Sequence, residues 1–170
     1  KLVTKLAPRV IAVAGMVICG AAILWLSTIG HDANYVGHVM PAIFLVAFGF
    51  GTGFVPLTLT AVSGVRSQDA GIASALLNAA QQIGVALGLA VLSTVSVTVA
   101  AGRHPNALAA LYEGRATHAD QLVAAASDAL VHGYTRALAV GALFLLAAAI
   151  VTAIAVNAAR PSEATSMPVH

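Results

Sequence analysis

The stretch "GIASALLNAAQQIGVALGLAVLSTVSVTVA", residues 71–100, contains neither a charged residue nor a proline. An apolar helix of about 20 residues is long enough to cross the hydrocarbon core of a bilayer, which is about 30 Å thick. As a helix this stretch would be about 45 Å long, so it must tilt or extend its ends into the headgroup layer. It therefore predicts a membrane-spanning helix.

The composition of the whole chain agrees with a membrane protein. Only 8% of the residues are charged, against about 25% in soluble domains. The mean hydropathy is +0.92, and the apolar runs are apolar nearly all round, which argues against a soluble alanine-rich bundle. A net charge of +2, with no basic cluster interleaved with aromatic residues, argues against a nucleic-acid partner.

Three further apolar runs, residues 10–29, 36–62 and 135–157, bring the expected spans to four. A basic lead-in, residues 1–9, precedes the first run, as in a secretory signal. Signal cores, however, are only about 7–15 residues long, which favours a span. We therefore expect an all-α, integral membrane helical bundle.

Polar segments connect the spans. They comprise an outer loop at 30–35, a cytoplasmic loop at 63–70, a long outer section at 101–134 and a cytoplasmic tail at 158–170. Within the long section, apolar residues recur at helical spacing, which predicts a short amphipathic extracytoplasmic helix on the surface, ended by Gly133. These apolar residues are Leu122, Val123, Ala126, Leu130 and Val131.

The basic residues predict the orientation, because Lys and Arg accumulate on the cytoplasmic side of membrane proteins. Four spans place both ends of the chain on the same side of the plasma membrane. With that side cytoplasmic, it holds Lys1, Lys5, Arg9, Arg66 and Arg160, whereas the outer side holds Arg103, Arg115 and Arg136.

The third span carries uncharged polar and small residues at helical spacing. Ser74, Asn78 and Gln82 lie four residues apart, and Gln81 stands beside this stripe. Gly84 and Gly88 form a GxxxG pair, which is typical of helix packing. The amides either hydrogen-bond to a neighbouring helix or contribute to a substrate pathway, which also needs uncharged polar groups.

The second span contains helix-weakening residues, namely Gly49, Gly51, Gly53 and Pro56. In lipid, such a break survives only where neighbouring helices or a cavity satisfy the freed backbone groups. We therefore expect this segment to face protein or a pathway.

No residue predicted to lie within a span is acidic, although proton-driven transport usually needs an intramembrane ionisable group. His38, at the outer end of the second span, is a weak candidate. Cys19 is a single thiol in an apolar stretch and is expected to pack. Without a catalytic or metal-binding motif, we expect no enzyme, no cofactor and no metal site. Asp69 is placed to cap the third span, and with Arg66 it forms either a cap in a solvated loop or a cytoplasmic latch.

The stretch from Gly49 to Val95 resembles the twelfth and thirteenth helices of the fourteen-helix drug:proton antiporters of the major facilitator superfamily, the QacA/EmrB type. The resemblance rests on the glycine-rich run ending in Pro56, on "DAG" at 69–71, on "ASALLN" at 73–78 and on "QIGVALG" at 82–88. The stretch "HGYTRALAVGALFLLAAAIV", residues 132–151, resembles the last span of that family.

The resemblance implies a C-terminal fragment that covers the last four helices of an antiporter. The implied function is the export of small hydrophobic or cationic compounds in exchange for protons, by alternating access. The implied partners are the lipid bilayer and the remaining N-terminal helices. A small membrane scaffold or accessory subunit, acting only through helix contacts, is the alternative. Because the chain begins with Lys1 and enters an apolar run almost at once, we expect a piece of a longer protein.

Overall fold

A computed structural model describes residues 8–30, 34–62 and 65–155 of the chain. These residues form helices and no strand, so the expected all-α class is confirmed. The predicted lead-in, outer loop and tail fall largely outside the described residues, and with them Lys1, Lys5, Asp32, Arg160 and Glu163. The helices are α1 (Pro8–Leu26), α2 (Met40–Val62), α3 (Ala70–Arg103), α4 (Ala107–Ala116) and α5 (Asp120–Ala155). A π-helical turn, η1 (Tyr35–Val39), precedes α2, and a 3₁₀ turn, η2 (Ser67–Asp69), precedes α3.

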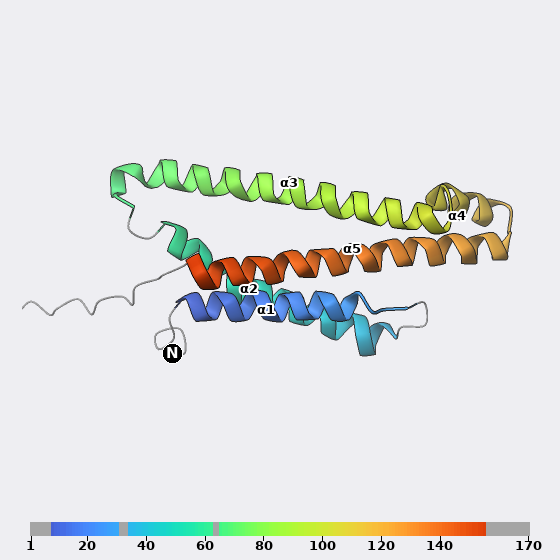
Figure 1. Ribbon diagram of the computed structural model, residues 1–170, viewed down its shortest axis with the longest axis horizontal. Coiled ribbons are helices and arrows are strands. Elements are labelled where there is room, and N and C mark those ends of the chain that lie inside the picture. The colour runs from blue at the N-terminus through green and yellow to red at the C-terminus, as the bar shows by residue number, and fades with distance from the viewer. Residues whose placement is uncertain (1–7, 31–33, 63–64, 156–170) are drawn as a thin grey trace, which may run out of the picture.

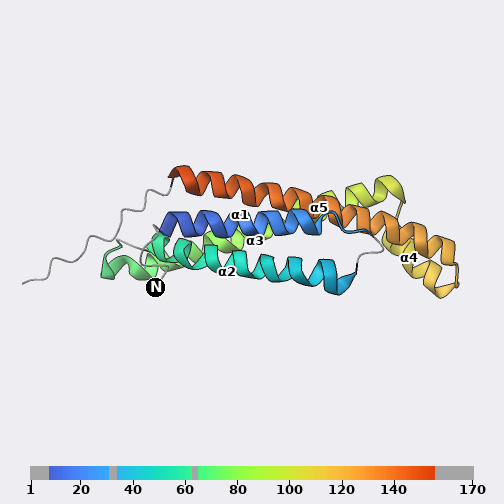
Figure 2. The same cartoon turned by 90° about the horizontal axis from the view of Figure 1, so that it is seen from below.

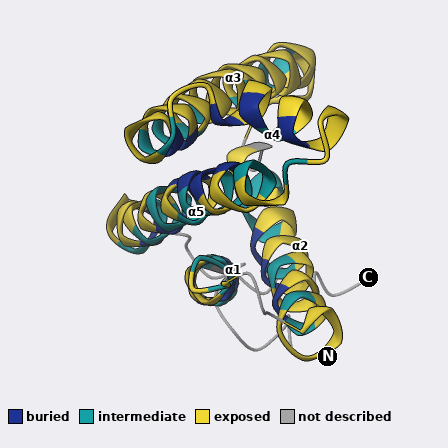
Figure 3. Ribbon diagram, turned by 90° about the vertical axis from the view of Figure 1, so that its right-hand side faces the viewer, coloured by how far each residue is buried: buried dark blue, intermediate teal, exposed yellow. Residues whose placement is uncertain are grey.

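Four helices of the described part of the chain are long and apolar enough to cross a membrane: α1, α2, α3 and α5. In this multi-pass arrangement α1 lies between α2 and α5, and α5 lies between α1 and α3 (Figures 1 and 2). The short helix α4 packs on α5, whereas α2 and α3 barely touch. Seen from the end, α3, α5 and α1 follow one another, with α2 beside α1 (Figure 3).

Glycines bring α1 and α2 into backbone contact. A Cβ atom added to Gly49 would lie 2.7 Å from the carbonyl oxygen of Gly15 and 2.7 Å from the nitrogen of Cys19. Gly53 makes a similar approach to Ala12, and Cys19 is buried in this contact. Because lipid tails are as apolar as the side chains, helices in a bilayer associate largely through such close packing. Gly49 and Gly53 therefore fix the α1–α2 pair.

The helix α5 runs without interruption through Gly133, which differs from the expected break at this residue. The residues expected to form a separate amphipathic helix belong to the first turns of α5, and the separate short helix is α4. A Cβ atom on Gly133 would collide with the carbonyl oxygen of Ser96 on α3. Gly133 thus permits a close helix contact, and the packing stabilises the helix at a residue that weakens it in isolation.

Two residues with left-handed backbone conformations bracket α4. Asn106 has φ 55° and His118 has φ 54°, and each lies in a turn beside this short helix. Asparagine tolerates this conformation better than most residues because its side chain hydrogen-bonds locally. The chain therefore leaves α3, makes one short helix and returns along α5.

The paired ends of α3 and α5 project beyond α1 and α2 on one side of the bundle (Figure 1). At 1.5 Å per residue, α3, with 34 residues, is about 51 Å long, and α1, with 19 residues, is about 29 Å long. The projecting part is held by an ion pair, in which Arg103 Nη1 on α3 donates to Asp128 Oδ2 on α5 across 2.8 Å. The polar section of the sequence is thus largely this projection.

We expect Gly133→Ala to lower the free energy of unfolding by about 1–3 kcal/mol, as overpacking does, because the added methyl group forces α3 and α5 apart. Gly141→Ala is the matched control on the same helix. There the new Cβ would meet only the side chain of Leu92, at an ordinary 3.6 Å. Thermal unfolding of the purified protein in detergent measures both variants, and equal melting temperatures would contradict the Gly133–Ser96 contact.

Candidate functional site

One face of α3 changes its surroundings halfway along the helix. Gln81, Gly88 and Leu92 follow one another at intervals of seven and four residues, so they lie on the same side. Further along that side, Ser96 is only 9% exposed and packs against α5. In the N-terminal half of α3, by contrast, Asn78 and Gln82 are exposed and Gln81 is half-buried. We call residues 71–89 of α3 the open half.

The three amide side chains of the open half have no hydrogen-bond partner within the described residues. Because α2 and α3 barely touch, the amides do not connect these two helices here. Two roles were expected for Asn78, Gln81 and Gln82: a hydrogen bond to a neighbouring helix, or a place in the wall of a substrate pathway. Within the described residues these side chains make no such hydrogen bond, and no other helix of the chain encloses them in a cavity.

The small residues of the open half also lack neighbours. A Cβ atom added to Gly84 or Gly88 would meet nothing within 4 Å, and Ser74 is exposed. Large apolar side chains are uncovered around them, as Ile72 (72% exposed) and Leu76 (70% exposed) show. Such an exposed surface on a helix requires lipid or further protein to cover it.

The helix-weakening residues of α2 separate into two groups. Gly49 and Gly53 are buried against α1, whereas an added Cβ on Gly51 would meet nothing within 4 Å. The helix continues through Pro56, so the expected break is absent. The missing N–H of Pro56 frees the carbonyl of Thr52, and lipid provides no substitute donor.

Phenylalanines cover the side of α2 that faces away from α1, a feature that the sequence reasoning missed. Phe44, Phe48, Phe50 and Phe54 are all exposed, and the rings of Phe50 and Phe54 stack with centroids 5.2 Å apart. Their spacing of four residues within each pair was the available signal. The amides of α3 and these rings lie on different helices that the chain does not bring together.

The loop between α2 and α3 carries an exposed ion pair. Arg66 Nε donates to Asp69 Oδ2 across 3.0 Å, and Arg66 Nη2 lies 3.0 Å from the same oxygen. Asp69 stands at the N-cap position of α3, but its carboxylate makes no capping hydrogen bond. Asp69 thus acts on the helix through its charge near the positive end of the helix dipole.

The other candidate groups stay separate. His38 is exposed in η1, and the described residues contain no group of three His, Cys, Asp or Glu side chains arranged to hold a metal ion.

Two cavities form only through helix pairing, so the sequence could not indicate them. One, of about 920 Å³, lies between α3, α4 and α5, and its hydroxyl groups are those of Ser93, Ser96 and Tyr134. The other, of about 300 Å³, lies between the end of α1 and α5.

Comparison with known proteins relates the chain to a puromycin resistance protein, a cephamycin export protein and an MFS-type transporter. It is 36% identical over 151 residues to the puromycin resistance protein pur8 of Streptomyces alboniger, covering 86% of this chain and 28% of that protein. It is 39% identical over 104 residues to the cephamycin export protein CmcT of Amycolatopsis lactamdurans, covering 61% and 21%. It is 33% identical over 96 residues to the MFS-type transporter EfpA of Mycobacterium tuberculosis, covering 56% and 18%.

The chain thus spans less than a third of the length of each of these relatives. No protein-family profile and no solved structure matches it. The resemblance to major-facilitator exporters is supported by the second and third of these relatives, whose names state export and MFS-type transport.

We expect Asp69→Ala to change the free energy of unfolding by less than about 1 kcal/mol, because exposed ion pairs contribute little. The side chains of Arg66 and Asp69 are 76% and 42% exposed. Thermal unfolding measures the effect, with Arg66→Ala as the partner variant. Because Arg66→Ala removes only the ion pair, the additional loss in Asp69→Ala measures the interaction of Asp69 with the helix dipole, and equal losses would contradict that interaction.

Proposed function

We propose that this chain forms the last four membrane helices of a proton-coupled multidrug exporter of the major facilitator superfamily, of the QacA/EmrB type. Its substrates would be small hydrophobic or cationic compounds, moved by alternating access between the two sides of the membrane. The observation that carries the proposal is the open half of α3, a surface of amides, glycines and apolar side chains left uncovered in a chain similar to part of much longer exporters.

The chemistry of the open half suits a substrate pathway. Asn78, Gln81 and Gln82 offer donors and acceptors without charge, next to exposed side chains such as Leu76 and Val85. Such a mixed wall accommodates varied apolar compounds, because no fixed charge selects among them. Protons would be carried by ionisable residues elsewhere in the full protein.

The phenylalanine side of α2 is the second proposed element of the pathway. The faces of Phe rings attract organic cations, with a gain of about 0.5–2 kcal/mol depending on desolvation. Phe44 and Phe48 share one side of the helix with Gly51, which leaves room in front of the rings. Helices of the N-terminal half would then bring this side and the open half of α3 to one cavity.

The loop pair of Arg66 and Asp69 is proposed to lie in the cytoplasm, together with both ends of the chain, as the distribution of basic residues favours. The pair lies in the segment that joins α2 to α3. Because the two helices barely touch, they are free to move relative to one another, and an exposed pair is cheap to break. These properties fit a latch that opens during alternating access.

Cysteine labelling of the full-length protein tests the pathway. In a Cys19→Ala background, cysteines at positions 78 and 82 should react with a membrane-impermeant thiol reagent at least fivefold faster than one at position 87. Leu87 is the matched control, because it is exposed on the opposite side of the same helix. The hydrophobic cation ethidium should slow the labelling of positions 78 and 82 and leave position 87 unchanged. Equal protection of all three positions would refute a pathway along this face.

A leucine substitution at each of two glycines tests whether another helix packs against the open half at Gly88, next to the amides that face the pathway. We expect Gly88→Leu to lower the melting temperature of the full-length protein by several degrees, because a helix packed on this face would meet the new side chain. Gly102→Leu, at the other end of α3, is the control, since both sites are open within this chain. If neither substitution changes the melting temperature, Gly88 faces lipid or water instead.

A further inference from the structure

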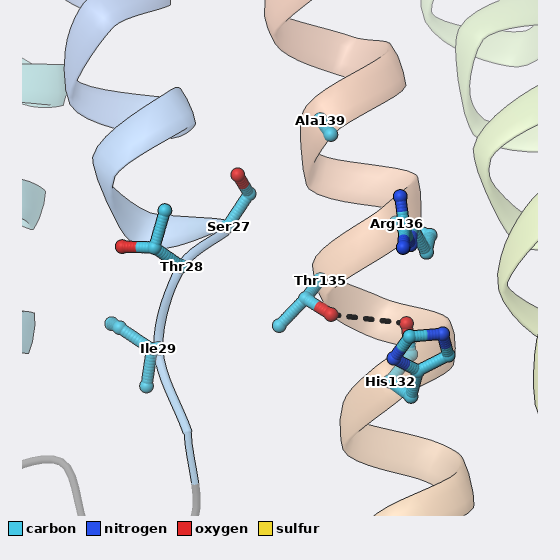
Figure 4. A pocket seen from close by; sticks show the side chains of 7 residues that line it. All are labelled: Ser27, Thr28, Ile29, His132, Thr135, Arg136 and Ala139. Atoms are coloured by element: carbon cyan, nitrogen blue, oxygen red, sulfur yellow. Dashed lines mark hydrogen bonds between the residues drawn. The ribbon is translucent and has the colours of Figure 1, made fainter.

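A small polar pocket lies where α1 ends against α5 (Figure 4). Its volume is about 300 Å³, within the range of roughly 300–1,000 Å³ found for ligand sites. One wall is formed by the residues that follow α1, and the other by one side of α5. The residues that line it are Ser27, Thr28, Ile29, His132, Thr135, Arg136 and Ala139.

The dimensions of the helices place this pocket in the headgroup layer. The helix α1 has 19 residues and ends at Leu26, so it spans about 29 Å. From Arg136 to the end of α5 at Ala155 the distance along the helix is also about 29 Å, close to the hydrocarbon thickness of about 30 Å. The exposed Trp25 beside the pocket agrees, since tryptophans gather at membrane interfaces.

The α5 wall supplies positive charge and hydrogen-bond donors. Arg136 is exposed and takes part in neither of the two ion pairs of the described residues, which join Arg66 to Asp69 and Arg103 to Asp128. His132 lies one helical turn away, and both residues are among those that line the pocket. A guanidinium group binds phosphate through a fork of two N–H groups.

The α1 wall has the opposite character. The hydroxyl of Ser27 donates to the carbonyl of Leu24, and that of Thr28 to the carbonyl of Trp25, each across 2.7 Å. On α5, Thr135 likewise donates to the carbonyl of His132, across 3.0 Å. A hydroxyl has a single proton, so these three oxygens can take part in further hydrogen bonds only as acceptors. The C-terminal end of α1 adds partial negative charge. This wall therefore favours a cation that donates hydrogen bonds.

We propose that the pocket binds the headgroup of phosphatidylethanolamine, with its phosphate on Arg136 and His132 and its primary ammonium against Ser27, Thr28 and the end of α1. The two walls match the two charges of this headgroup in sign and in hydrogen bonding. Phosphatidylcholine carries the same charges but its trimethylammonium group donates no hydrogen bond, and phosphatidylglycerol carries no cation. The site is independent of the transport function proposed above, because it requires only that the helices lie in a membrane.

Photo-crosslinking in the full-length protein tests this site. The probes are phosphatidylethanolamine and phosphatidylcholine, each with a diazirine in the acyl chain near the glycerol, incorporated into otherwise identical vesicles. Mass spectrometry then quantifies adducts on residues 24–29 and 132–139. We expect at least fivefold more adduct from phosphatidylethanolamine than from phosphatidylcholine. Equal labelling by the two lipids would overturn the ammonium contact.

Substitutions assign the contacts. Arg136→Gln should reduce the adducts at these residues at least fivefold and leave labelling elsewhere unchanged, whereas Arg136→Lys, which keeps the charge, should retain most of them. Arg115→Gln is the matched control, an exposed arginine on α4 that does not line the pocket. An equal loss in Arg136→Gln and Arg115→Gln would refute the phosphate contact.

The double variant Ser27→Ala and Thr28→Val separates the two walls. It should abolish the preference for phosphatidylethanolamine over phosphatidylcholine, and a preserved preference would contradict the proposed ammonium site. Competition with millimolar inorganic phosphate should leave the adducts unchanged. Displacement by inorganic phosphate would show that the site takes a free anion, and would overturn the lipid assignment.

Discussion

Close backbone contact at glycines is the interaction on which the arrangement of these helices depends. In water, helices associate because apolar faces leave the solvent, but in a bilayer the surroundings are equally apolar and association depends largely on tighter packing. The chain meets this requirement where Gly49 approaches Gly15 and Cys19, and where Gly133 approaches the carbonyl of Ser96. The first contact joins α1 to α2, and the second joins α5 to α3. Between these pairs, Gly20 of α1 faces Leu146 of α5, so glycines occur at each helix contact in the row.

The number of spans was predictable from the sequence, because length and hydropathy suffice to recognise a membrane helix. The role of each glycine or proline could not be predicted from the sequence. Gly133 and Pro56 weaken an isolated helix, yet both lie inside continuous helices of this structure. Whether such a residue breaks a helix or permits close packing depends on the backbone that lies opposite. That backbone belongs to another helix, and residues near Gly133 in the sequence carry no information about Ser96.

The sequence indicated which residues belong to the candidate site, but only part of where they lie in the structure. The spacing of Asn78, Gln81 and Gln82 indicated one region of the third span, and the structure leaves that region uncovered. A hydrogen bond from these amides to a neighbouring helix would need that helix to pack on the open half, and the helix next to α3 in this chain, α5, makes its glycine contact with the other half. The exposed phenylalanines of α2 could not be predicted as a surface feature, because a large apolar residue does not differ in hydropathy from its neighbours in an apolar span. In such a sequence, polar residues can be recognised from hydropathy alone, whereas an exposed aromatic surface cannot.

The uneven burial of α3 bears on how the helix works. Its C-terminal half is fixed to α5 by the Gly133–Ser96 contact and by the ion pair of Arg103 with Asp128. Its N-terminal half has neither kind of contact within the described residues. The residues farthest from the contact with α5 are therefore the least constrained by this chain. These include Asn78 and the loop pair of Arg66 and Asp69, which is also the exposed ion pair at the free end. The three amides of α3 thus lie in the half of the helix that has the fewest close contacts within this chain.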